Sequence, residues 1–322
     1  MTNKDITKIY FRGNEIVALY RGSTLIFKKS GVVPPKPTGV YTVRGTLKPD
    51  SRAQNIELKV NGVREQFAVN SDKTFEHTFV NVPVTNMDYF TLDCKEELKT
   101  LDLSDFDTSQ VTSMIEVFFQ GEVESLNISN LDTSNVTNMT RMFNGCQYLT
   151  DIDLSSFDTS NVTDMTGMFG GCYGLKSLDV SRFDTSKVTN MNSMFASCYN
   201  LTSLDVSNFD TSKVERISNM FYNNGKLTDL YINFDVRLNT YFENIFGLCF
   251  SLKNVVGKFE GTKFDLDLSH SPLTAASAMV FINGLATVTE KCTLSLKAST
   301  YDSLTPEQIA IATAKGWTVT RN

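Results

Sequence analysis

Acidic side chains recur along this chain at a spacing that could assemble a ligand-binding surface. One column of positions falls once per repeat of about 26 residues, each time between two residues of the leucine type. Its members are Asp102, Asn127, Asp153, Asp179, Asp205 and Tyr231. If each lies on a short strand of a parallel stack, neighbouring side chains stand about 5 Å apart on one exposed, concave face. Carboxylates separated by so short a distance repel one another, so each needs a hydrogen bond, a cation or free solvent.

This column has two interpretations. In the first, its side chains are solvated or are satisfied by hydrogen bonds within the repeats. In the second, Asp153, Asp179, Asp205 and Tyr231 form a face that binds a ligand or a cation. Tyr231 then serves as a platform for a sugar, because an aromatic ring offers apolar contact beside acceptors for hydroxyl groups.

No motif indicates enzymatic chemistry. The two histidines, His77 and His270, belong to no recognisable nucleophile motif. The chain contains no phosphate-binding glycine loop, no zinc-ligand spacing and no calcium loop of the EF-hand type. We therefore expect a protein without catalytic residues, cofactor or metal ion.

Cysteines form a second column with the same period. Its members are Cys94, Cys146, Cys172, Cys198 and Cys249. One thiol per repeat is typical of a packing position, where cysteine acts as a small buried hydrophobe. Disulfides and a metal site are the alternatives, but no CxxC motif or nearby histidine provides a zinc spacing. Cys292 lies outside the column, and the sequence does not explain it.

A third column lies in the phrase Asp-Thr-Ser-x-Val-Thr-x-Met, which opens most copies of the repeat. It contains Asp107, Asp132, Asp158, Asp184, Asp210 and Asp235. Aspartate in a turn accepts hydrogen bonds from backbone N–H groups, and Asp158, Thr159 or Ser160 could cap a following helix. We interpret Asp158, Asp184 and Asp210 as structural residues.

Each copy of the repeat predicts one strand, one capped turn and one short helix. Alternating apolar residues predict a strand over residues 149–154. A helix over residues 162–172 is predicted by four apolar residues at helical spacing. They are Val162, Met165, Phe169 and Cys172. One copy buries too little apolar surface to offset the entropy of ordering it, so the copies must stack.

The repeated pattern as a whole resembles that of a known family. The pattern LxxLDLSxFDTSxVTxMxxMFxxCxxL over residues 149–175 and 175–201 resembles the BspA-like leucine-rich repeats of bacterial surface proteins and bacteriophage tail-associated proteins. The resemblance covers about half of the chain. It implies an α/β solenoid, namely a curved, right-handed leucine-rich-repeat stack with a parallel sheet, but no single ligand or activity. The pattern is broken at Gln120, Gly121, Asn224 and residues 234–237.

The other segments predict small units at both ends of the repeats, which span residues 83–270. Residues 1–30 predict a three-stranded β-meander for attachment or assembly. Residues 31–39, with three prolines within four residues, predict a linker. Residues 40–82 predict a small β domain of four strands that caps the first end of the stack, and residues 271–322 an α/β cap at the other end.

The C-terminal cap carries the clearest local signals. It predicts helices over residues 272–285 and 305–315 and strands over residues 292–297 and 317–320. Thr305 and Gln308 form a capping box at the start of the second helix. SPLTAASAMVFINGLATV and LTPEQIAIATAKGWTV resemble the C-terminal ends of repeat-bearing tail proteins from phages and prophages of Gram-positive bacteria. IYFRGNEIVALYRGSTLIF resembles the N-terminal segment of such proteins.

Composition argues against several kinds of partner. A net charge of −6 and a pI near 5.1 disfavour binding to nucleic acid. No apolar run approaches the roughly 20 residues that span a bilayer, so we expect no membrane insertion. The first residues, MTNKDITKIYF, lack the order of a signal peptide.

These features predict a non-enzymatic adhesion or receptor-binding component of a phage or prophage tail, made in the bacterial cytoplasm and located in the virion. Its partners would be a bacterial surface polysaccharide or protein and, through residues 1–30, other tail proteins or a second copy of the chain. The alternative is a bacterial cell-surface leucine-rich-repeat adhesin or interaction protein. An intracellular scaffold is a third hypothesis.

Overall fold

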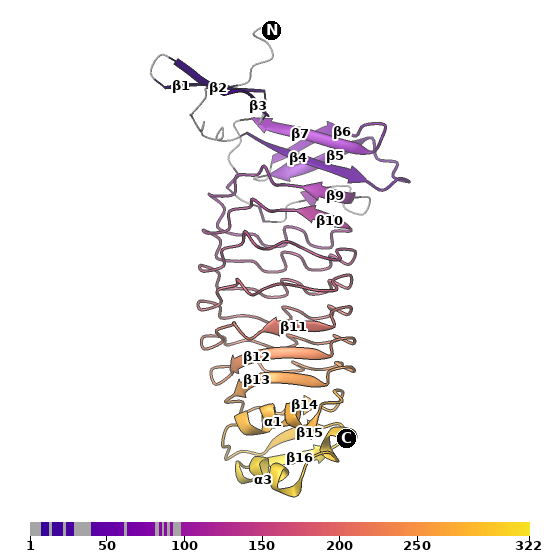
Figure 1. Cartoon of the computed structure of the whole chain (residues 1–322), viewed down its shortest axis with the longest axis vertical. Coiled ribbons are helices and arrows are strands. Elements are labelled where there is room, and N and C mark those ends of the chain that lie inside the picture. Colours follow the sequence, from indigo (N-terminus) through magenta and orange to yellow (C-terminus); the bar gives the residue numbers. More distant parts are fainter. Residues whose placement is uncertain are drawn as a thin grey trace.

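The repeats lie one below another along the long axis of the molecule, between a small β unit and a mixed α/β unit (Figure 1). The computed structural model describes residues 98–322 without a gap. Before them it describes residues 8–12, 15–21, 24–28, 40–60, 63–80, 84, 85, 87, 88, 91 and 92. The predicted linker, residues 31–39, lies outside the described residues.

The first strands form an antiparallel sheet in the order β1-β2-β3. Their bounds are β1 (Lys8–Arg12), β2 (Glu15–Arg21) and β3 (Thr24–Lys28). The chain then continues through β4 (Val40–Leu47), β5 (Asn55–Val60), β6 (Val63–Ala68), β7 (Thr74–Val80) and β8 (Thr91–Leu92). Strands β5, β6 and β8 form one sheet, in the order β6-β5-β8.

A continuous sheet joins this N-terminal β unit to the first repeats. Its order is β10-β9-β4-β7, where β9 (Leu98–Asp102) and β10 (Ser125–Asn127) belong to the repeats. Strand β4 is antiparallel to β9, and β9 is parallel to β10. An ion pair of 3.1 Å between Arg44 and Asp105 adds to the contact. The β unit therefore pairs with the backbone at the first end of the stack.

The predicted helix over residues 162–172 is wrong. Between residues 98 and 274 the structure contains no helix, and residues 162–172 form turns. A parallel ladder of single bridges runs through this segment, linking Ser113, Asn138, Asp164, Asn190, Arg216 and Tyr241. The strand predicted over residues 149–154 is likewise absent from that copy, although strands occur at the equivalent position in copies nearer both ends.

Backbone hydrogen bonding explains why this segment is not helical. N–H groups of alternate residues donate to the next repeat: Met139 to Asp164, Arg141 to Thr166, Phe143 to Met168 and Gly145 to Gly170. Residues between them close tight turns, as Met142 does on Met139. Several positions have positive φ, among them Arg141, Gly145, Gly167 and Gly171. An α-helix requires right-handed dihedrals and bonds within the segment, so the two arrangements exclude each other.

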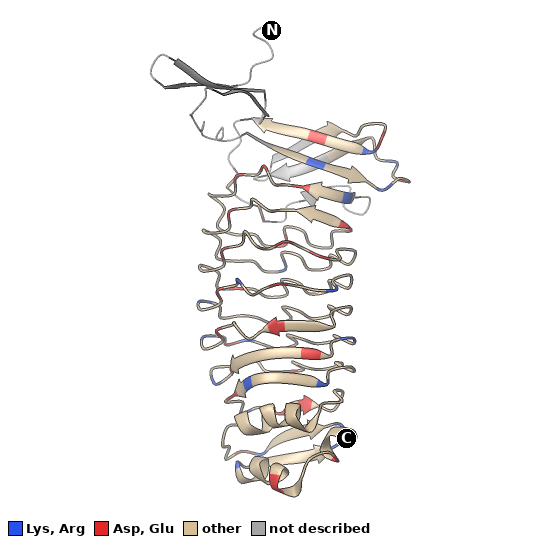
Figure 2. Cartoon of the chain, in the orientation of Figure 1, with Lys and Arg blue, Asp and Glu red and all other residues tan. Residues whose placement is uncertain are grey.

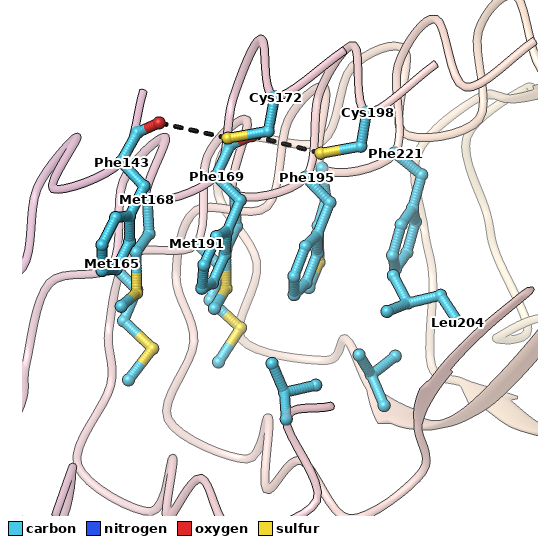
Figure 3. Close-up of a cluster of buried hydrophobic side chains, with 14 of the residues drawn as sticks. Phe143, Met165, Met168, Phe169, Cys172, Met191, Phe195, Cys198, Leu204 and Phe221 are labelled. Atoms are coloured by element: carbon cyan, nitrogen blue, oxygen red, sulfur yellow. Dashed lines mark hydrogen bonds between the residues drawn. The ribbon is translucent and has the colours of Figure 1, made fainter. Parts of the chain in front are cut away.

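A stack of phenylalanine rings fills the core of the repeats. Successive ring centroids from Phe118 through Phe143, Phe169, Phe195 and Phe221 to Phe246 lie 5.3, 5.5, 5.8, 6.0 and 5.7 Å apart. The rings are nearly parallel, and buried methionines pack beside them (Figure 3). Each copy therefore buries its apolar residues against the copies above and below it. Assignment of this stack to the leucine-rich-repeat α/β solenoids stays a prediction.

Two parallel sheets complete the chain. The first has the order β11-β12-β13, with β11 (Ser203–Val206), β12 (Asp229–Asp235) and β13 (Asn254–Glu260). The second has the order β14-β15-β16, with β14 (Leu266–Leu268), β15 (Cys292–Leu296) and β16 (Trp317–Arg321). Helices α1 (Ala275–Gly284), α2 (Ala298–Tyr301) and α3 (Pro306–Ala314) accompany the second sheet.

The local signals of the C-terminal unit are confirmed. Thr305 and Gln308 form the predicted capping box of α3, and Gly316 follows that helix with a φ of 90°. Cys292 now has a structural explanation, since it is buried on β15 and its Sγ donates to the carbonyl oxygen of Lys263 at 3.2 Å. None of the helices in the described part of the chain has the length and apolar character that a membrane span requires.

Candidate functional site

The parallel pairing of β11, β12 and β13 builds an exposed grid of side chains. Asp205, Tyr231 and Val256 lie in register across the three strands. One row further along, Asn233 pairs with Lys258. We call these five residues, Asp205, Tyr231, Asn233, Val256 and Lys258, the strand face. All five are exposed.

Alternation along the strands places the strand face outward. On β12, Leu230, Ile232 and Phe234 are buried, whereas Tyr231 and Asn233 between them are exposed. Because successive side chains of a strand point to opposite sides, burial of Leu230, Ile232 and Phe234 forces Tyr231 and Asn233 into solvent. The phenylalanine core therefore fixes the orientation of Tyr231.

Gly257 keeps β13 close to β12 between Val256 and Lys258. Its φ is +117°, and a Cβ atom there would lie 1.8 Å from the carbonyl oxygen of Ile232. Only glycine fits so close an approach in this left-handed region. This single residue thus holds Val256 and Lys258 beside their partners on β12.

The strand face has an apolar part and a polar part. Tyr231 is 39 % exposed and Val256 is 52 % exposed, and the two are cross-strand neighbours. Beyond them, at the carboxyl ends of the strands, lies a hollow of about 340 Å³. Its polar lining includes Ser207, Asp210, Asn233, Asp235, Lys258 and Glu260. Figure 2 shows acidic residues on β11 and β12 and a basic residue on β13.

The charges around this hollow are largely paired. Arg237 donates to both carboxylate oxygens of Asp235, and this contact lowers the pKa of Asp235. The Nζ atom of Lys258 lies 3.9 Å from a carboxylate oxygen of Glu260. The hollow therefore offers both hydrogen-bond donors and acceptors.

The aspartates of the predicted column accept hydrogen bonds from serines of their own repeats. Asp153 and Asp179 each accept a hydrogen bond of 2.9 Å, from the backbone of Ser155 and Ser181 respectively. Hydrogen bonds from the side chain and backbone of these serines lower the pKa of both carboxyl groups. Asp205 likewise accepts bonds from Ser207, at 2.9 Å from its N–H and 2.7 Å from its hydroxyl. These contacts favour the interpretation in which the aspartates are satisfied within their own repeats.

The structure brings Asp205 and Tyr231 together, because β11 and β12 pair in register. Asp153 and Asp179 line a separate small hollow that also contains Arg182. Among the described residues, no group of three or more histidine, cysteine, aspartate and glutamate side chains could hold a metal ion. The column therefore changes from carboxylates that are hydrogen-bonded within their own repeats to the exposed Tyr231 at its C-terminal end, and Val256 lies beside Tyr231 on the next strand.

The cysteine column packs the core. The thiols of Cys146, Cys172, Cys198 and Cys249 are free and buried, and burial raises the pKa of each of them, for Cys146, Cys198 and Cys249 to about 12. Each Sγ donates at 3.1 Å to a phenylalanine carbonyl oxygen of the preceding repeat. Cys94 lies outside the described residues.

The third column stabilises turns that no helix follows. The side chains of Asp158, Asp184 and Asp210 accept bonds of 2.9 Å from the backbone N–H groups of Ser160, Ser186 and Ser212. The prediction that residues at this position cap a helix is therefore wrong, because the segment that follows them joins the ladder of bridges between repeats.

One residue of the repeated phrase has a role other than the predicted helix cap, and one set of exposed residues was not predicted. The buried Thr159 donates to the carbonyl oxygen of Asp184 and accepts from its N–H, so the threonine of the repeated phrase links adjacent copies. A further exposed aromatic column comprises Tyr148, Tyr173, Tyr199 and Phe250. Its signal was available, since an aromatic residue follows Cys146, Cys172, Cys198 and Cys249 by one or two positions.

Comparison with known proteins gives a family for the repeats. A family model described as "Mycoplasma protein of unknown function, DUF285" matches residues 85–178 and 148–259. Together these matches span residues 85–259, more than half of the chain, and include the whole strand face. The match is compatible with a BspA-like repeat protein, and its description names no activity, ligand or partner. No curated protein matches the chain.

Proposed function

The chain belongs to the DUF285 family, and from this premise and the geometry of the strand face we propose that it is a non-enzymatic adhesion or receptor-binding protein. In this proposal it recognises a ligand of the bacterial envelope, a polysaccharide or a protein, through the strand face. It is a component of a phage or prophage tail, made in the bacterial cytoplasm and carried in the virion. Residues 1–30 attach it to other tail proteins or to a second copy of the chain.

One observation carries the binding part of the proposal: Tyr231 lies in register between Asp205 and Val256 on a paired parallel sheet. Side chains on paired strands keep a fixed geometry, which favours recognition over side chains on free loops. A large aromatic residue that remains 39 % exposed on such a sheet offers binding energy that the fold does not use.

The tail assignment rests on different support. The terminal segments resemble those of repeat-bearing tail proteins, whereas membership of the family fits a bacterial cell-surface adhesin equally well. Neighbouring genes distinguish the two: tail, holin and lysin genes favour the first, and a secretion or anchoring cassette favours the second.

Retention of the purified full chain on bacterial envelope material tests the proposed function. Cell walls and isolated wall polysaccharide are the probes, and the variants are Tyr231→Ala and Asp205→Ala. We expect retention of the unaltered chain and a loss of retention for Tyr231→Ala. Lack of retention on every envelope preparation would refute adhesion.

Tyr173→Ala is the matched control, because Tyr173 is exposed to a similar degree, 46 %, and lies outside the strand face. Equal loss for Tyr173→Ala and Tyr231→Ala would assign binding elsewhere or to a general effect on folding. Thermal unfolding of each variant, followed by circular dichroism, separates these two explanations.

A further inference from the structure

The apolar part of the strand face is too small for the centre of a protein interface. Apart from Tyr231 and Val256, the exposed residues of the strand face are the polar or charged Asp205, Asn233 and Lys258. Stable protein partners bury about 800 Å² on each side, with a core depleted of charged residues. Two apolar side chains, bordered on one side by a column of aspartates, do not provide such a core.

The dimensions instead suit a single ring-shaped ligand that continues into the hollow. Tyr231 and Asn233 are two residues apart on one strand, so their side chains are separated by about 7 Å along it. Val256 and Lys258 repeat this spacing on β13. The distance from Tyr231 and Val256, the apolar pair, to Asn233 and Lys258, the polar pair, is therefore about the size of one sugar ring. At about 340 Å³, the hollow has the capacity of a small-molecule site.

A pyranose ring matches this pattern of groups. The C–H face of such a ring is apolar and stacks on aromatic side chains, while its hydroxyl groups lie around the edge and need donors and acceptors. Asn233 and Lys258 supply N–H donors, and Asp235 and Glu260 supply acceptors.

The charge of the hollow narrows the class of sugar. Three carboxylates, those of Asp210, Asp235 and Glu260, line it together with one amine, that of Lys258. Arg237, which binds both oxygens of Asp235, adds a second positive charge, so three carboxylates face two cations and the hollow keeps a net negative charge. An anionic ligand would be repelled by the excess of carboxylates.

We infer, on the basis of the proposed function, that the strand face binds an uncharged polysaccharide: one pyranose ring stacks on Tyr231 and Val256, and the adjoining hydroxyl groups enter the hollow beside Asn233 and Lys258. Asp153 and Asp179 take no part, since they line a separate hollow outside the strand face and each accepts a hydrogen bond from a serine of its own repeat.

The test uses the full chain and bacterial cell walls treated in two ways. Periodate oxidises the vicinal diols of sugars, and protease removes wall proteins. We expect retention on protease-treated walls and its loss on periodate-treated walls. The opposite result would overturn the sugar inference and leave the proposed function standing, whereas absence of retention on untreated walls would overturn the proposed function itself.

Variants test the stacking contact separately. Tyr231→Ala should lower the affinity for wall polysaccharide at least about tenfold, whereas Tyr231→Phe keeps the ring and should change it less than about threefold. Equal losses for the two variants would contradict stacking. Dextran, a soluble neutral polysaccharide with vicinal diols, should compete for binding better than polygalacturonate, and stronger competition by polygalacturonate would contradict the uncharged class.

Discussion

The thiol of Cys172 donates a hydrogen bond to the carbonyl oxygen of Phe143 in the preceding repeat, across 3.1 Å (Figure 3). Cys146, Cys198 and Cys249 donate equivalent bonds, whereas in the copy between Cys198 and Cys249 the cysteine is replaced by Asn224. The Nδ2 group of Asn224 donates to the carbonyl oxygens of Phe195 and Phe221, at 2.9 and 3.0 Å. Its Oδ1 atom is buried and has no hydrogen-bond partner among the described residues.

Restoring the column at this position should stabilise the protein. A buried acceptor without a partner destabilises a fold by about 1 to 3 kcal/mol. Asn224→Cys removes this acceptor and keeps one donor to the preceding repeat. We expect a higher midpoint of urea unfolding for this variant. Cys198→Asn introduces the same defect one repeat earlier and should lower the midpoint. A less stable Asn224→Cys variant would show that the two amide bonds outweigh the unpaired oxygen.

The buried threonine of the repeated phrase should matter more than its exposed neighbour. Thr159 binds both the N–H and the C=O of Asp184, at 2.8 and 2.9 Å. Thr159→Val keeps the shape but leaves both groups unpaired, at a cost of about 2 kcal/mol or more. Thr163→Val is the control. Thr163 also bonds to a neighbouring repeat, through the carbonyl oxygen of Thr137, but it is exposed and water can replace this bond, so we expect a change below about 0.5 kcal/mol. Equal unfolding midpoints for the two variants would contradict this role.

Acid should destabilise the repeats. Hydrogen bonds from the serine two residues ahead lower the pKa of Asp153, Asp158, Asp179, Asp184 and Asp210. A carboxyl group whose pKa is lower in the folded state stabilises the fold above its unfolded pKa, which is about 3.9, and this contribution is lost as the pH falls towards the folded-state value. Melting temperatures should therefore decline below about pH 4. Asp158→Asn, which keeps an acceptor but cannot titrate, should decline less. An identical decline would assign the acid sensitivity to other groups.

Much of the local structure could be predicted from the sequence. The capping box at Thr305 and the packing column around Cys172 follow from residue types and spacing alone. Their physical causes act within one element or recur identically in every repeat, so a single sequence contains the whole signal.

The segment over residues 162–172 could not be predicted in the same way. Its apolar spacing is that of a helix, but its competing hydrogen-bond partners belong to the next repeat, and single-segment periodicity carries no information about them. The available warning was the presence of Gly167 and Gly171, because glycine is a poor helix former and adopts the positive φ that both residues have in the structure. For the candidate site, the sequence indicated Asp205 and Tyr231. Val256 and Lys258 enter only through the register of β13, which the sequence pattern does not specify after its period fades.

Hydroxyl-radical footprinting of the full chain with and without solubilised wall polysaccharide tests the central claim most directly, because it reports the exposure of individual side chains. Binding at the strand face predicts strong protection of Tyr231 and Val256, with Tyr148, Tyr173 and Tyr199 oxidised as in the free protein. Protection of those three tyrosines with Tyr231 unchanged would contradict the account and assign binding to the other aromatic column.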